Sequence, residues 1–146
     1  MGEETPKYRF EYYSNRETRV YKTYQIIGMR YGSVARKMFK VRQGLYNKGL
    51  VEDHHVIPRQ HSRHPTIKRF DYDMNAGSNL VMLPTERGKE VLSLREGRLV
   101  HVGKHAGYNK YVGDILNVIT TEEELCAFTD FLKVACRYRP QDIPWR

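Results

Sequence analysis

Six histidines lie between residues 54 and 105, and their types and spacing could build a metal site. They are His54, His55, His61, His64, His101 and His105. Three neutral imidazoles around a cation with an open coordination position describe a hydrolytic metal site. A lone histidine is more often a solvated or hydrogen-bonded side chain. The prediction of a site therefore depends on how several of them combine.

The adjacent pair His54-His55 is predicted to divide two tasks. Residues 50–58, LVEDHHVIP, favour a short strand that ends at Pro58. Because neighbouring side chains of a strand point to opposite faces, the two histidines cannot both bind one ion. One would bind the metal and the other would handle a proton. His101 and His105, four residues apart on a helix, would share one face and chelate the same cation.

The elements that must position these histidines follow from local patterns. Residues 79–84, NLVMLP, indicate a second strand that Pro84 stops. The polar connection 59–78 is long for a structureless loop, and loops of this length are usually functional. A helical turn is predicted around 89–94, and apolar residues recur with helical spacing from 105 to 119.

Two further helices are predicted outside this core. Ser33 can cap a helix that Gly49 ends, with one apolar face formed by Val34, Met38, Val41 and Leu45. The pair Thr121 and Glu124 has the capping-box pattern, and Pro140 ends the helix that follows. Its buried face would comprise Leu125, Phe128, Leu132 and Ala135. Residues 1–32 are compatible with short strands or an extended arm.

The expected fold is α+β. At 146 residues the chain forms one ordinary domain. It would divide into a basic extension (1–50), a core with the histidines (51–118) and a C-terminal helix (119–146). No apolar run reaches membrane-spanning length, and the N-terminus lacks a signal-peptide pattern, so a cytoplasmic location is expected. Cys126 and Cys136 fit neither a disulfide framework nor a zinc knuckle, and core positions are expected for both.

The net charge of +8 indicates a polyanionic partner. Residues 1–50 hold most of the excess, with 11 Lys and Arg against 4 Asp and Glu, or +7. Side chains of the first helix could follow nucleic-acid phosphates, although a charged helix face is most often simply solvated. The candidates are Arg36, Lys37, Lys40 and Arg42.

Four motifs, in order, resemble the AHH branch of the HNH/endonuclease VII nuclease superfamily. They are DHHVIPRQ (53–60), RHP (63–65), NLVMLP (79–84) and HVGKHAGYNKYV (101–112), and the resemblance covers about residues 51–116. It implies a ββα-metal (His-Me finger) core in which His54 is a metal ligand and His55 the general base. His101 and His105 would complete the ligand set. Asn79 would belong to the catalytic site by stabilising the loop between the strands.

One residue departs from the family pattern. Asp53 stands where the branch has alanine or another small residue. The preceding Glu52 is similar to the acid of the E-x-H-H motif in colicin-type nucleases, which pairs with an arginine.

The function implied by the resemblance is metal-dependent endonucleolytic cleavage of DNA, with RNA also open and with low sequence specificity. The cofactor would be one divalent ion, with Zn, Mg, Mn and Ni all compatible. Residues that could support the ligands or contact substrate are Glu52, Arg59, His64, Lys104 and Tyr108. Plainer interpretations exist for each: Tyr108 would pack, His64 would be a solvated loop residue, and His61 is expected to be structural.

Two rival functions remain open from the sequence. A structural zinc domain could bind nucleic acid or protein without chemistry, but it has no use for the spare His55. Alternatively, the nuclease could act as a toxin held by an immunity protein. The expected partner of the nuclease is nucleic acid, as double-stranded DNA, and in the toxin case the main partner would be the immunity protein.

Overall fold

The computed structural model describes residues 29–146, so most of the predicted N-terminal arm lies outside the described residues. The elements in chain order are α2 (Val34–Arg42), β1 (Val51–His55), η3 (Arg59–His61), α3 (Pro65–Arg69), η4 (Gly77–Asn79), β2 (Leu80–Pro84), α4 (Glu86–Val91), α5 (Ala106–Val118), α6 (Glu122–Tyr138) and η5 (Pro140–Asp142). Within 29–146, no helix is long and apolar enough to cross a membrane.

The two predicted strands pair with each other. β1 and β2 are antiparallel, with a register that runs from Val51 opposite Pro84 to His55 opposite Leu80. Both predicted strands are present, but β1 ends at His55, three residues before the predicted stop at Pro58. The connection between them is not structureless, because it contains η3, α3 and η4.

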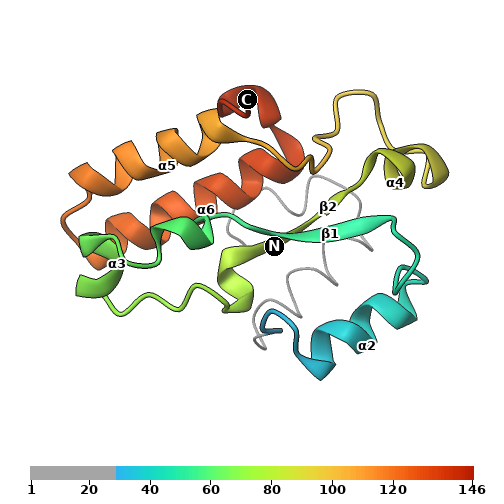
Figure 1. Cartoon of the computed structure of the whole chain (residues 1–146), viewed down its shortest axis with the longest axis horizontal. Coiled ribbons are helices and arrows are strands. Elements are labelled where there is room, and N and C mark those ends of the chain that lie inside the picture. Colours follow the sequence, from blue (N-terminus) through green and yellow to red (C-terminus); the bar gives the residue numbers. More distant parts are fainter. Residues whose placement is uncertain (1–28) are drawn as a thin grey trace, which may run out of the picture.

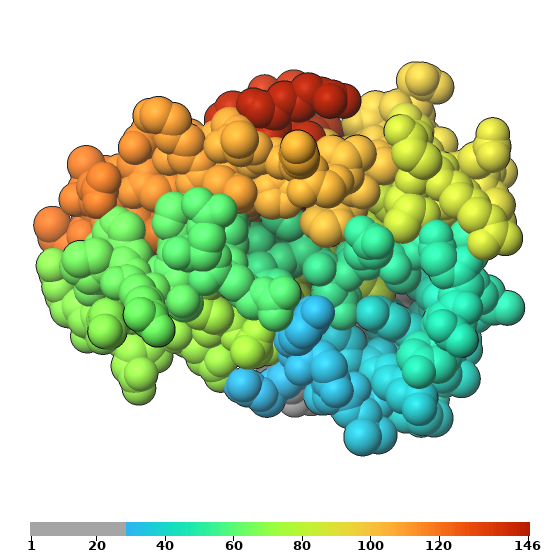
Figure 2. All heavy atoms as spheres, in the orientation of Figure 1, coloured from blue at the N-terminus to red at the C-terminus, as the bar shows by residue number. Residues whose placement is uncertain are grey.

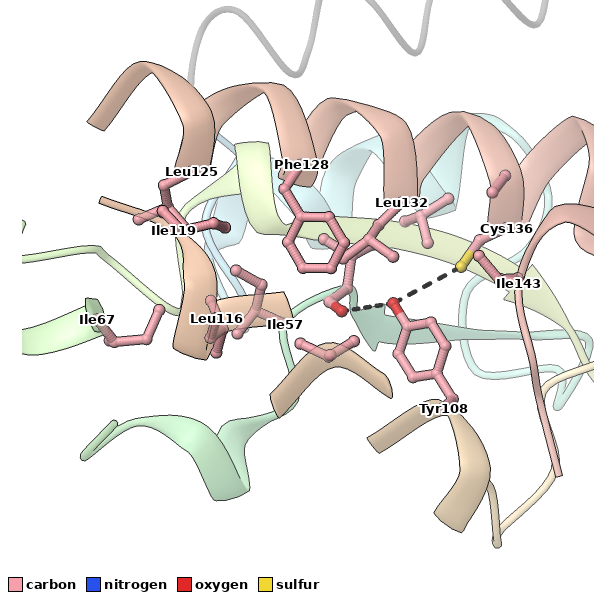
Figure 3. Close-up of a cluster of buried hydrophobic side chains, with 14 of the residues drawn as sticks. Ile57, Ile67, Tyr108, Leu116, Ile119, Leu125, Phe128, Leu132, Cys136 and Ile143 are labelled. Carbon is pink, nitrogen blue, oxygen red and sulfur yellow. Dashed lines mark hydrogen bonds between the residues drawn. The ribbon is translucent and has the colours of Figure 1, made fainter. Parts of the chain in front are cut away.

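Helices cover both sides of this small two-stranded sheet, so the fold is α+β, as predicted. Figure 1 shows α5 and α6 side by side on one side of the strands and α2 on the other. The main core lies between α5, α6 and the strands (Figure 3). Its fully buried residues include Ile57, Val81, Leu116 and Leu132.

The C-terminal half confirms the predicted helices. Thr121 caps α6, and both hydrogen bonds of the capping box with Glu124 are present. The face predicted to be buried is buried, at Leu125, Phe128, Leu132 and Ala135. The cysteine prediction is half wrong: Cys136 is buried on α6, whereas Cys126 is exposed.

The prediction for α2 is correct about its start and wrong about its end. The Ser33 side chain accepts a hydrogen bond from the Arg36 amide and caps the helix. The helix ends at Arg42, because Gly44 adopts a positive φ of 72° soon after it. Gly49, the predicted stop, instead belongs to the turn before β1.

The predicted apolar face of α2 is not the buried one. Val34 is 76% exposed, whereas Arg36 is 4% exposed and Phe39 is 5% exposed. The reason is electrostatic, because the Arg36 guanidinium pairs at 2.9 Å with the buried carboxylate of Asp53 on β1. A buried carboxylate must be paired, and this requirement overrides the apolar pattern of the helix.

The helix expected to carry both His101 and His105 begins too late for this. α5 starts at Ala106, so His105 is its N-cap and His101 lies in the preceding loop. The His101 amide donates to the Pro84 carbonyl at 2.8 Å, which holds the loop against the end of β2. Gly103, within this span, also disfavours a helical turn.

Candidate metal centre and active site

All three predicted metal ligands come together, although no helix carries two of them. One nitrogen from each of His54, His101 and His105 lies within 4.8 Å of the other two. His54 comes from β1, His101 from the loop after α4, and His105 from the start of α5. Among the described residues this is the only group of three or more His, Cys, Asp or Glu residues that could hold a metal ion.

Hydrogen bonds orient two of these rings. His101 Nδ1 lies 2.6 Å from a Glu52 carboxylate oxygen. His105 Nδ1 lies 3.0 Å from Oδ1 of Asn109. Since both oxygens accept, each Nδ1 donates, and each Nε2 keeps its lone pair for a cation.

The third ring supplies the strongest sign that the cluster suits an ion. His54 Nε2 is buried and has no hydrogen-bond partner among the described residues. Burial lowers the pKa of His54 well below its usual value, and the nearby His101 and His105 lower it further. A neutral ring with an unsatisfied buried nitrogen has the chemistry of a metal ligand.

Aromatic rings enclose the histidine trio. Tyr108 is fully buried, its ring centroid lies 5.1 Å from that of His54, and its hydroxyl donates to the Val56 carbonyl (Figure 3). The Trp145 ring lies 4.7 Å from His105 and 5.2 Å from His54, measured between centroids. The packing interpretation of Tyr108 therefore holds. Sequence reasoning missed Trp145, and the one available signal was that it is the chain's single tryptophan.

His55 occupies different surroundings from its neighbour. Its Nε2 lies 2.9 Å from Oδ1 of Asn75, and its ring lies 4.8 Å from that of Tyr31. Burial lowers the pKa of His55, and the hydrogen bond to Asn75 only partly opposes this. His55 is therefore neutral at pH 7, with the proton on Nε2 and a lone pair on Nδ1. The strand alternation separates the two histidines as predicted.

The positively charged side chain of Arg59 lies near His55. The Arg59 guanidinium sits 5.3 Å from the centroid of Tyr31, the ring that also contacts His55. Arg59 is exposed and contributes to the low pKa of His55. Arg59 is thus a predicted supporting residue that the structure places near the candidate base. Sequence reasoning missed Asn75 in this part of the site.

Asn79 holds the connection between the strands. Its Oδ1 accepts from the Ile57 amide at 3.0 Å and from the Tyr72 hydroxyl at 2.9 Å. Its Nδ2 donates to the carbonyls of Ile57 at 3.1 Å and Met74 at 2.8 Å. Because Asn79 is fully buried, it can act only by positioning this loop, which also carries Asn75.

Of the two acids before the histidine pair, the one that pairs with an arginine among the described residues is Asp53, not Glu52 as the motif suggests. Glu52 contacts His101, not an arginine. Asp53 pairs with Arg36, and its other oxygen lies 2.9 Å from Lys40 Nζ. Alternation along β1 explains this, because Glu52 and His54 share one face and Asp53 and His55 share the other.

The remaining predicted residues lie outside the histidine trio. The His64 side chain caps α3 by accepting from the Thr66 amide, and its Nε2 bonds Asn117 Oδ1 at 2.8 Å. His61 Nε2 bonds the Asn109 carbonyl at 2.8 Å. Lys104 is exposed between the two candidate ligands of its loop.

Comparison with known families agrees with this geometry. The sequence profile of AHH, described as a nuclease family of the HNH/ENDO VII superfamily with conserved AHH, matches residues 37–134. The chain belongs to the AHH nuclease family. No curated protein matches the chain, and no solved structure does.

Asp53 departs from the pattern that gives the AHH family its name. The family is named for a conserved alanine before two histidines, and this chain has Asp53 before His54-His55. The larger, charged residue is accommodated because Arg36 and Lys40 of α2 neutralise it. The substitution thus ties α2 to the strand that carries the histidine pair.

The Glu52–His101 contact leads to a testable prediction about metal affinity. Glu52→Ala should weaken metal binding about 10- to 100-fold, because the His101 ring loses the partner that orients it. Glu52→Gln should retain most of the affinity, since its amide oxygen can still accept from Nδ1. Calorimetric titration of both variants with Zn²⁺ measures the difference, and equal affinities for Glu52→Ala and wild type would contradict the proposed orientation.

Proposed function

We propose that this AHH nuclease is a metal-dependent endonuclease that hydrolyses DNA phosphodiester bonds, with His55 as general base. The observation that carries the proposal is the division of adjacent histidines between two environments. His54 turns an unpartnered nitrogen toward two further imidazoles. His55 keeps a free lone pair next to Arg59 and Tyr31 on the other face of the strand.

The chemistry of cleavage follows from these residues. His55 Nδ1 takes a proton from the water that attacks the phosphorus, while Asn75 holds the opposite nitrogen and so the ring orientation. His54, His101 and His105 would hold a divalent ion, which supplies Lewis-acid stabilisation of charge on the phosphate and on the leaving oxygen. His55 is the last residue of β1, so a phosphate lying across the strand end can reach both sides.

Basic residues near His55 support a polyanionic substrate. A cavity of about 340 Å³ is lined by Tyr31, Gly32, Ser33, Arg36, Lys37, Lys40, Tyr46 and Asp53. Arg36 and Lys40 are both paired with Asp53 within it, so phosphate contacts are proposed for Lys37 of the cavity and for Arg42 and Arg59 outside its lining. Such contacts provide affinity without sequence information, which agrees with low specificity.

Cleavage assays with and without metal test the proposed function. Purified protein should convert supercoiled plasmid to nicked and linear forms when Mg²⁺, Mn²⁺, Ni²⁺ or Zn²⁺ is supplied, and EDTA should stop the reaction. Three imidazoles suit Zn²⁺, Ni²⁺ or Mn²⁺, whereas Mg²⁺ would keep much of its shell as water and phosphate. Zn²⁺ binding with no cleavage by any of these ions would instead indicate a structural metal domain.

A further inference from the structure

A groove lined mostly by residues of polar types begins beside the candidate metal centre and follows α5 away from it. Its volume is about 450 Å³, within the usual range of ligand sites of ~300–1,000 Å³. Figure 2 shows α5, in orange, lying along the green segment that forms the opposite wall. The lining residues are Gln60, His61, His64, Ala106, Asn109, Lys110, Gly113, Asp114 and Asn117.

Asn109 joins this groove to the metal centre. Its Oδ1 accepts from the candidate ligand His105, and its Nδ2 donates to Gln60 Oε1 at 3.0 Å. Its backbone carbonyl accepts from His61 Nε2. A molecule lying in the groove would therefore be separated from the metal centre by a single side chain.

The wall formed by His61 depends on a glycine. A Cβ atom on Gly113 would lie 2.9 Å from Cε1 of His61, closer than real side chains approach. The absence of a side chain lets the imidazole lie directly against α5, where it lines the groove. The His61 and His64 rings, both in the lining, are 6.3 Å apart between centroids and nearly perpendicular, at 80°.

The groove offers neutral hydrogen-bonding groups and little charge. Lys110 Nζ lies 2.9 Å from a carboxylate oxygen of Asp114, and the charges of these two lining residues cancel. Gln60 Nε2, Asn117 Nδ2 and His61 Nδ1 make no hydrogen bond with any described residue. Amide and imidazole groups of this kind suit the edge and face of a nucleobase, whereas a phosphate would need cations.

We propose that the groove binds one unstacked nucleobase of the strand that is cut, next to the scissile phosphate. This inference rests on the proposed nuclease function and adds a substrate preference to it. A base inside a duplex would have to leave its stack and its partner, which costs free energy. Single-stranded or frayed DNA is therefore the preferred substrate of this site.

Binding measurements on a cleavage-deficient chain test the groove directly. The probe is a labelled single-stranded DNA oligonucleotide, titrated with the full-length His55→Ala chain loaded with Zn²⁺ and followed by fluorescence anisotropy. Asn117→Trp, added to this chain, fills the groove and should weaken binding about tenfold. Val118→Trp is the matched control, since Val118 is the adjacent residue, is 69% exposed and does not line the groove. It should change affinity by no more than about twofold.

Abasic substitutions identify the base itself. One base at a time is removed along the oligonucleotide, and removal at one position should weaken binding about tenfold. In the Asn117→Trp chain the same removal should have no further effect. Should Asn117→Trp fold poorly, Gln60→Ala removes one donor from the opposite wall without added bulk and should give the same pattern.

The outcome separates this proposal from the nuclease proposal. Equal binding by the Asn117→Trp and Val118→Trp chains, or an abasic penalty that survives Asn117→Trp, would overturn the nucleobase site. The proposed function fails on a different result, namely wild-type protein that cuts no DNA with any divalent ion. Groove binding is measured without cleavage, so each proposal can fail alone.

Discussion

His55→Ala should lower the rate of DNA cleavage by about 10²- to 10⁴-fold while leaving metal affinity nearly unchanged, because the variant loses only the proton acceptor. The three candidate ligands keep their positions, since His55 contacts Asn75 and Tyr31 on the other face of β1. Initial rates of plasmid nicking and a Zn²⁺ titration measure the two effects separately.

Chemical rescue distinguishes a lost base from a damaged fold. Added imidazole should restore part of the activity of His55→Ala, since a small base can enter the space that the ring has left. It should not restore activity to a variant that lacks a metal ligand. Wild-type cleavage by His55→Ala, or loss of metal binding together with activity, would refute the assignment of His55 as base.

His105→Ala should weaken metal binding about 100-fold or more and remove most of the metal-dependent stabilisation, because two imidazoles remain where three converged. At a metal concentration 100 times its dissociation constant, wild-type protein gains about 2.7 kcal/mol. A variant that binds 100-fold more weakly gains about 0.4 kcal/mol at the same concentration, from RT ln 2. His105 is preferred over the more buried His54 because its removal disturbs the core less.

The structure supplies both the readout and the control for this experiment. Trp145 is the chain's only tryptophan and lies 4.7 Å from His105, so its fluorescence reports binding at this site. His64→Ala is the same substitution at a histidine outside the trio. It should lower basal stability, because His64 caps α3, yet keep the full stabilisation by metal. Unchanged metal-induced stabilisation in His105→Ala would show that the trio is not the metal site.

The fold could be predicted wherever local patterns specify it. β2 ends at Pro84, and α6 begins at a capping box, so these bounds follow from a few neighbouring residues. The exposed face of α2 could not be predicted in this way. Its orientation depends on Asp53, a residue of β1 that pairs with Arg36 and Lys40. Helical periodicity carries no information about such a distant partner.

The candidate site, like the fold, was predictable only in part from the sequence. The sequence by itself determined which histidines are available, and strand alternation separated His54 from His55. Only the tertiary structure decided what surrounds them: Asn75 beside His55, Asn109 beside His105, and Trp145 against the trio. The convergence of His101 and His105 was predicted for the wrong reason, since a loop and a helix start bring them together. Backbone geometry acts between neighbours in the chain, whereas ring orientation, burial and pKa depend on contacts that folding creates between distant segments.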